Sequence, residues 1–441
     1  MTDAQTLLAN DPWWLMLIKV VVIFVFLLTW TIFNVWFERK WLGKMQDRRG
    51  PNMNGPFGLG QALADGLKLL FKEDFRPAKT DRIIFNLAPW LTAAAAFTMW
   101  TVIPIGGEVS MFGHQTVLQV SDLPVGTLFI LAISSIGIYG IVLAGWASNG
   151  TYSLLGSMRA TAQLISYEVA MGLSVVAVFM VSGSMSTSDI VNAQSQLITL
   201  FGQEISLPGW YALLLIPSFV TYVISMFGET NRTPFDLAEC ESELVSGHIT
   251  DFSGFRYALY FLAEYINMGT VSAVATTLFL GGYRAPYPFN TMFDGYLDQG
   301  WFGPLWFLLK VQGLIFFFVW VRASVPRFRY DQFMVLGWKV LIPANMVWIM
   351  VVAVFRSWNA HSSPALLGVA GAVTASALAI LIFSSIQRTR LERSKSAAPR
   401  LVAPSPGSYP VPPRPGEQLP ELAGWMPAAI AVEASHPAGG K

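Results

Sequence analysis

The chain has 441 residues, of which 54% are hydrophobic and 12% are charged, and its mean hydropathy is +0.50. Soluble domains carry about 25% charged residues, so this composition excludes a soluble protein. The formal net charge of +1 provides no overall attraction for nucleic acid, which we do not expect as a partner. We predict an all-α fold, a polytopic helical bundle embedded in the lipid bilayer.

Apolar runs of about 20 residues, the length needed to cross a bilayer, predict the membrane domain. It covers residues 1–386 and is expected to contain nine transmembrane helices, at 14–37, 83–105, 125–148, 162–183, 208–228, 255–281, 303–323, 336–355 and 366–386. The remaining segment, 387–441, is rich in proline and lacks apolar periodicity. It is expected to be a disordered cytoplasmic tail.

The distribution of Lys and Arg predicts the orientation, because these residues are retained on the cytoplasmic side. Loop 38–82 carries ten of them, whereas loops 106–124 and 184–207 carry none. We therefore expect a multi-pass protein of the cell (inner) membrane with its N-terminus outside and its C-terminus in the cytoplasm.

The loop after the first predicted span contains the pattern of an amphipathic helix. In GLGQALADGLKLLFKE (58–73), leucines recur at helical spacing on one face, and Asp65 and two lysines lie on the other. Such a helix lies in the membrane interface on the cytoplasmic side. The simplest role is an anchor, although Asp65 and Glu73 would allow a second one.

Three glutamates lie within or directly beside apolar runs: Glu168, Glu229 and Glu264. A charge in hydrocarbon costs about 3 kcal/mol or more, and such residues commonly mark ion or proton routes. Each acid could instead pair with a nearby base and only orient helices. The stretch GETNRTPFDLAECESELVSG (228–247) adds further carboxylates after Glu229. This clustering favours a proton or cation path, because neighbouring carboxylates raise one another's pKa.

The sequence predicts no redox centre or metal site on this chain. Its one cysteine, Cys240, excludes an intrachain disulfide and a Cys-ligated zinc or iron–sulfur site, and its four histidines show no ligand spacing. No Gly-rich phosphate loop follows a strand. Redox cofactors are therefore expected on partner chains.

Four long stretches of the sequence match one known family in order. They are ERKWLGKMQDRRGPNMNGPFGLGQALADGLKLLFKE (38–73), GWASNGTYSLLGSMRATAQLISYEV (145–169), ETNRTPFDLAECESELVSG (229–247) and RASVPRFRYDQ (322–332). From about residue 13 to about residue 355, the chain resembles the H subunit of proton-translocating NADH–quinone oxidoreductase, respiratory complex I. The mitochondrial counterpart is membrane subunit 1.

The resemblance implies a subunit of a translocase that itself carries no catalytic residue. In that family the subunit lies between the peripheral and membrane arms and forms a quinone chamber with peripheral-arm subunits. FMN and the iron–sulfur clusters lie on partner subunits, so this chain alone would bind no cofactor. Quinone, either ubiquinone or menaquinone, would be the substrate.

The resemblance also implies site residues, position by position. The quinone chamber would be lined by Arg39, Asp65, Arg232, Phe235 and Arg322. The proton path and its surroundings would comprise Glu38, Glu73, Glu168, Glu229, Asp236, Glu239, Glu241, Glu243 and Glu264. Arg232 and Asp236 lie four apart, so one helical turn would pair them, although Pro234 lies between them.

The sequence departs from the family in this region. The family usually has Ala where Gly228 stands, Gly where Cys240 stands, an aromatic residue where His248 stands, and Glu where Asp251 stands. His248 is expected to be a solvated loop histidine, and the alternative is a group that titrates near neutral pH.

Three other functions remain open at this point. The first is the homologous membrane subunit of a hydrogenase-type or other cofactor-linked proton-pumping complex. The full matches RRGPN and RFRYDQ favour the quinone enzyme over this alternative. The second is a stand-alone cation transporter, which the absence of an obvious internal repeat disfavours. The third is a structural anchor for a peripheral complex.

Overall fold

The structure is a computed structural model in which residues 3–195, 197–200, 203–236, 245–286, 289, 298 and 300–360 are described. The predicted ninth span, the Pro-rich tail, Cys240 and three predicted acids, Glu239, Glu241 and Glu243, lie outside this part of the chain. The principal helices are α1 (Asp3–Ala9), α2 (Trp13–Met45), α3 (Gly60–Phe71), α4 (Arg82–Met99), α5 (Gly126–Ser148), α6 (Thr151–Ser182), α7 (Thr187–Ala193), α8 (Tyr211–Leu214), α9 (Ile216–Glu229), α11 (Gly254–Phe279), α12 (Gly303–Ser324), α13 (Tyr330–Leu336) and α14 (Ile342–Ala360).

Helices coincide with each of the eight predicted spans that fall within the described residues. Within the described residues, six helical stretches are long and apolar enough to cross a membrane: Trp13–Met45, Arg82–Val102, Gly126–Ser148, Thr151–Ser182, Gly300–Ser324 and Tyr330–Arg356. The chain is therefore a polytopic helical membrane protein, as predicted. The nine-span topology stays a prediction, since α9 and α11 are not among the six.

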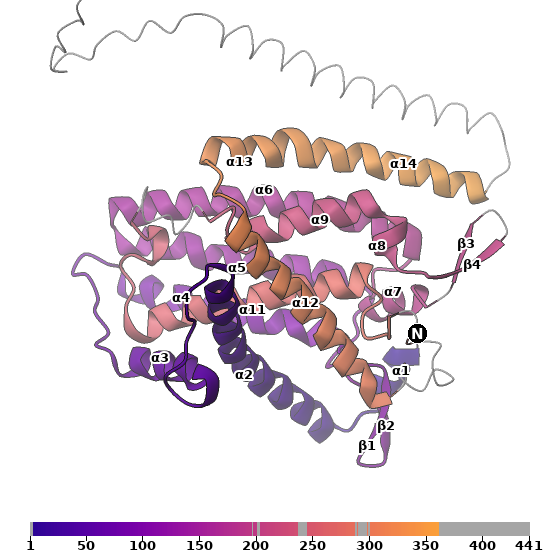
Figure 1. Cartoon of the computed structure of the whole chain (residues 1–441), viewed down its shortest axis with the longest axis horizontal. Helices are drawn as coiled ribbons and strands as arrows, with labels where there is room; N and C mark the ends of the chain where they lie inside the picture. Colours follow the sequence, from indigo (N-terminus) through magenta and orange to yellow (C-terminus); the bar gives the residue numbers. More distant parts are fainter. Residues whose placement is uncertain are drawn as a thin grey trace, which may run out of the picture. The chain divides into compact units, whose positions relative to one another are not determined.

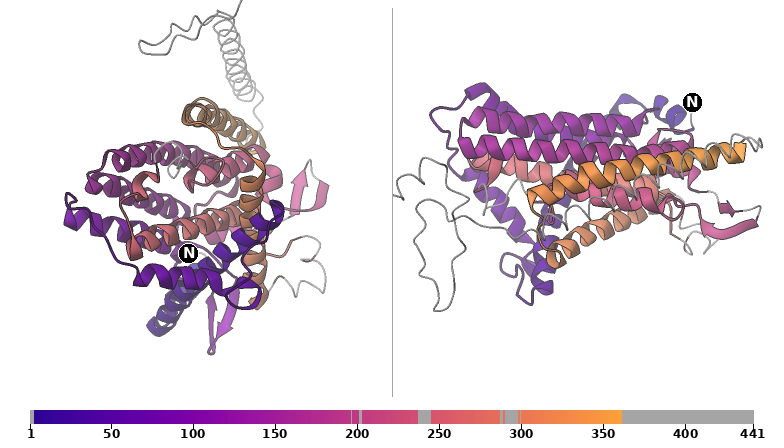
Figure 2. Two further views of the ribbon diagram at one scale, coloured as in Figure 1. Left: turned by 60° about the vertical axis from the view of Figure 1, so that its left-hand side comes forward. Right: turned by 90° about the horizontal axis from the view of Figure 1, so that it is seen from above.

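The helices form one bundle with two oblique members. α4, α5, α6, α9 and α11 run alongside one another, whereas α2 and α12 cross them at an angle (Figure 1). Within the bundle α4 packs on α5, α5 on α6, and α6 on α9. α14 lies along α6, as Figure 2 also shows. Glu168 on α6, Glu229 on α9 and Glu264 on α11 are thereby carried by elements of the same bundle.

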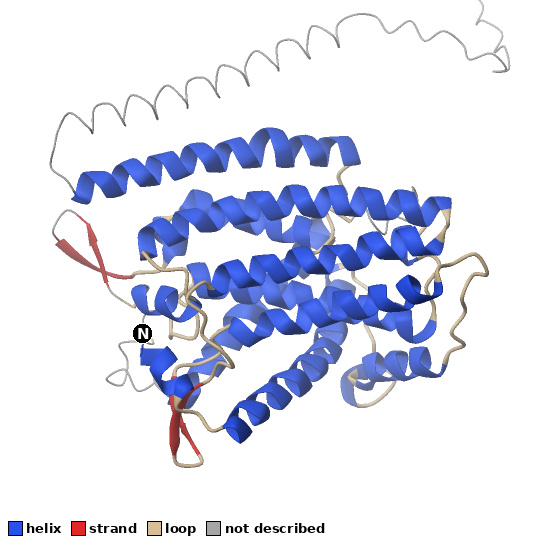
Figure 3. Cartoon of the chain, turned by 180° about the vertical axis from the view of Figure 1, so that it is seen from behind, coloured by secondary structure: helices blue, strands red, loops and turns tan. Residues whose placement is uncertain are grey.

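The two β-hairpins and the interfacial helix α3 lie at opposite ends of this bundle. β1 (Glu108–Met111) pairs with β2 (His114–Val117), and β3 (Leu197–Leu200) pairs with β4 (Gln203–Pro208), both antiparallel. Both hairpins lie at one end of the bundle, away from α3 (Figures 1 and 3). The hairpins of the two loops without Lys or Arg thus share an end, and the orientation in the membrane stays a prediction.

Close helix packing depends on small residues, as is usual in membrane bundles. A Cβ atom added to Gly140 on α5 would lie 2.0 Å from Thr92 Oγ1 on α4. A Cβ atom added to Gly228 on α9 would lie 2.4 Å from Tyr167 Cγ on α6. Gly228 therefore lets the last turn of α9 approach α6 directly before Glu229.

Two lysines satisfy polar groups at the hairpin end. Lys19 Nζ on α2 lies 2.6 Å from Asp11 Oδ2 and donates to Thr116 Oγ1 of β2 at 2.6 Å. Lys310 Nζ on α12 donates to the carbonyl oxygens that follow α11, those of Leu280 (2.6 Å), Gly282 (3.0 Å) and Arg284 (2.7 Å). A cation at a helix C-terminus offsets the negative end of the helix dipole.

The predicted amphipathic helix is present as α3. Three of its leucines, Leu63, Leu67 and Leu70, are exposed. This apolar face suits the membrane interface that the sequence predicts for it.

Candidate functional site

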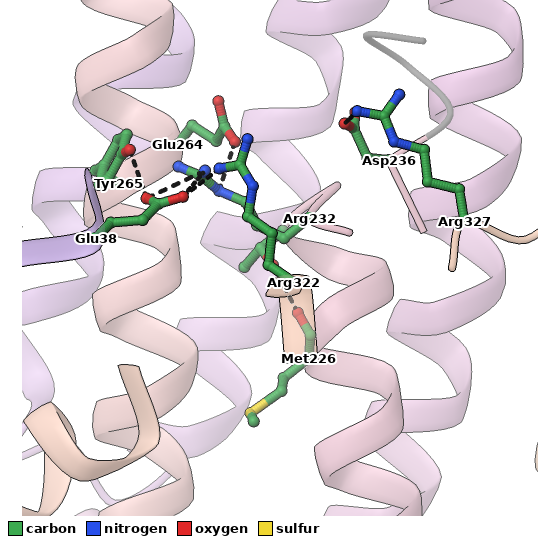
Figure 4. A network of polar contacts seen from close by, with 9 residues as sticks. Glu38, Met226, Arg232, Asp236, Glu264, Tyr265, Arg322 and Arg327 are labelled. Atoms are coloured by element: carbon green, nitrogen blue, oxygen red, sulfur yellow. Dashed lines mark hydrogen bonds and ion pairs between the residues drawn. The ribbon is translucent and has the colours of Figure 1, made fainter. Parts of the chain in front are cut away.

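Four separate segments bring the central charged cluster together. Glu38 lies near the C-terminal end of α2, and Arg322 lies in the last turn of α12. Glu264 and Tyr265 are neighbours on α11, and Arg232 lies in the turn that follows α9. Figure 4 shows these five side chains pointing toward one another. We call them the Glu38–Arg232 cluster.

Arg232 contacts both carboxylates of the cluster. Its Nη1 atom lies 3.3 Å from Glu38 Oε1, and its Nε atom lies 2.8 Å from Glu264 Oε1. Its guanidinium carbon also lies 4.3 Å from the centre of the Tyr265 ring, a cation–π arrangement. One guanidinium therefore links an acid of α2 to an acid of α11.

Glu38 has three partners and is almost fully buried. Tyr265 Oη donates a hydrogen bond to Glu38 Oε2 at 2.6 Å, and Arg322 Nη1 donates to Glu38 Oε1. Only 5% of the Glu38 side chain is exposed. A carboxylate removed from water needs such partners, because an unpaired buried charge costs several kcal/mol.

The charge of Arg232 is held by its surroundings. Burial alone would lower the pKa of its guanidinium, but the Glu264 and Glu38 carboxylates raise that pKa well above its usual value. Arg232 therefore keeps its proton. Any change in the charge of the cluster would come from protonation of Glu38 or Glu264.

A second group of polar contacts lies on α5. Ser134 Oγ donates to Glu229 Oε1, and the adjacent Ser135 Oγ donates to Glu168 Oε1. Neighbouring hydroxyls of one helix thus hold acids from α9 and α6. Two of the three acids that the sequence places within or beside apolar runs, Glu168 and Glu229, are thus tied to α5.

A cavity of about 60 Å³ joins the two groups, because Glu229 and Glu264 both line it. Its other polar side chains include those of Asn231, His248 and Asn267. A site of this size holds several water molecules, at roughly 10–15 Å³ each in the same measure. The carboxylates of α9 and α11 therefore face one shared cavity.

The predicted pair of Arg232 with Asp236 is wrong. Arg327 Nη2 lies 3.3 Å from Asp236 Oδ2, while Arg232 pairs with Glu38 and Glu264 (Figure 4). The cause is local: α9 ends at Glu229, and residues 230–236 form turns around Pro234 rather than a helical turn. Proline cannot donate the backbone hydrogen bond that a helix needs.

The other predicted chamber residues lie on α2, on α3 and in the turn that carries Arg232. Arg39 Nη1 lies 2.6 Å from Asp65 Oδ2, which ties α2 to α3. Phe235 is buried, and its ring lies 5.5 Å from that of Tyr167 and 4.8 Å from that of Phe333. Gln163 Nε2 donates to the Phe235 carbonyl oxygen at 2.9 Å, which fixes the turn that carries Arg232.

Glu73 is exposed beyond the end of α3, and its assignment to the proton path or its surroundings stays a prediction. One expectation about a single residue is wrong. His248 is buried rather than solvated, with its ring 5.6 Å from that of Tyr260. Burial lowers the pKa of His248 from 6.5 to about 4, so it is neutral at pH 7 and does not titrate there.

Comparison with known proteins identifies the family. The sequence matches the NADH dehydrogenase family over residues 18–353. It is 57% identical over 434 residues to the H subunit of the NADH-quinone oxidoreductase of Cutibacterium acnes, covering 97% of both chains. The corresponding H subunits of Streptomyces avermitilis and Frankia casuarinae are 48% and 51% identical, with 95% and 92% of this chain covered, and 90% and 88% of theirs.

The chain belongs to the family of NADH-quinone oxidoreductase H subunits. This result confirms the family inferred from the four sequence stretches. Among the described residues of this family member, no group of three or more His, Cys, Asp or Glu side chains is arranged to hold a metal ion.

Sequence reasoning missed several partners of the predicted acids in this family member. Tyr265 was overlooked although it follows Glu264 on an apolar helix, where a polar pair is itself a signal. Ser134 and Ser135 form a polar doublet in an apolar run and could have been found in the same way. Arg327 lies in the matched stretch 322–332, and the structure pairs it with Asp236.

Proposed function

We propose that this chain is the membrane subunit of an NADH–quinone oxidoreductase that forms a quinone chamber with peripheral-arm subunits. We propose further that its carboxylates couple quinone reduction to proton translocation. Quinone is then the substrate, and electrons arrive from FMN and iron–sulfur clusters on those partner subunits.

One observation carries the proposal: residues assigned to the chamber and residues assigned to the proton path share one ion-pair network. Arg232 and Arg322, on the chamber side, both contact Glu38, and Arg232 also contacts Glu264. A change of charge at the quinone therefore alters the energy of Glu38 and Glu264 directly. At about 4 Å and an effective dielectric constant of about 20, one unit charge changes a neighbour's energy by about 4 kcal/mol.

The cavity supports the next step of the path. Glu264 lines the same space as Glu229, and Glu229 is held by a serine adjacent to the one that holds Glu168. Carboxylates arranged in this way exchange protons through water, and their titrations are coupled. The proposed path thus runs from Glu38 through Glu264 and Glu229 to Glu168.

The decisive experiment replaces Glu229 with glutamine in the whole complex. Glutamine keeps the size and hydrogen bonding of the side chain but cannot ionise. We expect Glu229→Gln to assemble and to oxidise NADH normally with an artificial acceptor that takes electrons at the flavin. Quinone reduction and the proton gradient in reconstituted vesicles should both fall.

Glu108→Gln is the matched control, because Glu108 is exposed on β1 and outside the proposed path. It should leave every activity unchanged. Normal quinone reduction with a normal proton gradient in Glu229→Gln would overturn the proposed path.

The proposed orientation in the cell membrane places the N-terminus outside and the C-terminus in the cytoplasm. Reporter proteins that are active on only one side of the membrane test this when fused to either end. A C-terminal reporter that is active only outside would contradict the orientation, and two ends on the same side would contradict the nine-span topology.

A further inference from the structure

The cavity between Glu229 and Glu264 has a specific chemical character. Four buried polar atoms of residues that line it have no hydrogen-bond partner within the described part of the chain: Glu229 Oε2, Asn231 Oδ1, His248 Nδ1 and Asn267 Oδ1. Buried polar atoms are rarely left without a partner, since each costs about 1–3 kcal/mol. The atoms therefore point to a polar ligand in the cavity.

The size of the cavity and the type of these atoms identify the ligand. About 60 Å³ is room for a few water molecules. Three of the four atoms are acceptor oxygens, and the fourth belongs to an imidazole, which donates or accepts according to its tautomer. Water supplies donors to the oxygens and either role to the imidazole, whereas a bare anion would be repelled by Glu229.

His248 has the place and the chemistry to organise such waters. Only 5% of the residue is exposed, and its ring meets that of Tyr260 edge-on, at 84°, which fixes its orientation. The segment Gly247–Ile249 that carries it lies against α6, where a Cβ atom added to Gly156 would be 2.5 Å from Gly247 Cα. A rigid imidazole at the wall of the cavity thus presents one nitrogen without a protein partner in the described part of the chain.

We propose that His248 is a positioning residue that binds an internal water cluster in this cavity and so connects Glu229 with Glu264. The inference rests on the proposed proton path and assigns to it a residue at which the chain departs from its family. His248 stays neutral and does not store the proton. Its nitrogen orients a water, and the proton passes through the waters from one carboxylate to the other.

The test compares His248→Phe with His248→Gln in the purified complex. Phenylalanine keeps the ring against Tyr260 but removes the nitrogen, and glutamine restores a hydrogen-bonding group. We expect His248→Phe to slow quinone-linked proton pumping by about fivefold, the effect of one lost hydrogen bond. The solvent deuterium isotope effect on turnover should increase, and His248→Gln should recover part of the rate.

Two outcomes separate this inference from the proposed function. If Glu229→Gln impairs pumping but His248→Phe has the wild-type rate and isotope effect, the water cluster is overturned and the carboxylate path stands. If His248→Phe acts through the path, adding it to Glu229→Gln should slow proton pumping little further. If the losses of the two single variants add in full in the double variant, the inference is contradicted.

A direct measurement covers the case in which His248→Phe fails to assemble. An experimental density map of the wild-type complex that resolves ordered water should show water within hydrogen-bonding distance of His248 Nδ1. A map that shows ordered water elsewhere in the membrane domain, but a protein atom bonded to this nitrogen, would overturn the proposal.

Discussion

Arg232 and Glu38 lie 194 positions apart in the sequence, and yet their side chains form a buried ion pair. The pair joins the turn after α9 to the end of α2. Because Glu264 shares the same guanidinium, the contact holds three segments at once. The Glu38–Arg232 cluster is therefore a structural junction, and in the proposed function it is also the point at which charge passes between the chamber and the membrane acids.

Arg232→Gln is expected to destabilise the subunit. It leaves two carboxylates without their shared partner, and breaking a buried pair in this way costs about 3–5 kcal/mol. Arg232→Lys should cost less but still lower quinone reduction, because an ammonium lacks the planar fork that reaches both acids. Thermal unfolding of the purified complex measures the first effect, and quinone reductase activity the second. Arg329→Gln is the control, since Arg329 forms an exposed pair with Asp331 and should shift stability by about 0.5 kcal/mol or less.

Tyr265→Phe should separate the two roles of that side chain. The variant loses the hydrogen bond to Glu38 but keeps the ring beneath Arg232. A hydrogen bond to a charged group contributes about 1.5–3 kcal/mol, so we expect a smaller loss of stability than in Arg232→Gln together with slower quinone reduction. Wild-type quinone kinetics in an assembled complex would show that Glu38 does not need the phenol.

Asp236→Asn should slow quinone reduction while the complex assembles. The change removes the charge that faces Arg327 at 3.3 Å. NADH oxidation by an artificial acceptor at the flavin should persist. Asp331→Asn, in an exposed pair, should change neither activity. If both activities of Asp236→Asn fall together with the amount of complex, the residue serves assembly instead.

His248 should make the stability of the protein depend on pH in the acidic range. Its folded-state pKa of about 4 lies below the usual 6.5, so the unfolded state binds the proton first as the pH falls. Stability is then lost between pH 6.5 and about 4, by up to about 3 kcal/mol, and is unaffected above that range. His248→Phe should lack this loss. If the stabilities of the two proteins change with pH in the same way over this range, the burial of His248 is contradicted.

The helices could be predicted from sequence, because an apolar run of bilayer length has few other structures available. Their ends could not: α6 begins at Thr151, although its predicted span begins at 162. The polar residues before Ala162 continue the helix beyond the apolar run, and hydropathy does not detect such a continuation. The short hairpin β1–β2 was missed for a similar reason, since four-residue strands carry little periodic signal.

The acids of the site could be predicted, but their partners could not. Glu38 meets Arg322 across 284 positions, and no spacing rule reaches that far. Spacing also misled at Arg232 and Asp236, where helical periodicity was extended through Pro234. The burial of His248 depends on how Tyr260 and α6 cover it, which is a property of packing that the loop sequence does not contain.

The formal charges of Glu38, Glu264, Arg232 and Arg322 sum to zero. A proton that arrives on either acid therefore leaves this set of four side chains with an uncompensated positive charge in surroundings of low polarity. Neutrality would be restored if another proton left the set. Arg232 and Arg322 cannot release one, because a guanidinium does not give up its proton in a protein. A second mobile proton or a negatively charged reactant can restore neutrality, so in the proposed proton path the uptake of one proton at this site favours the release of another.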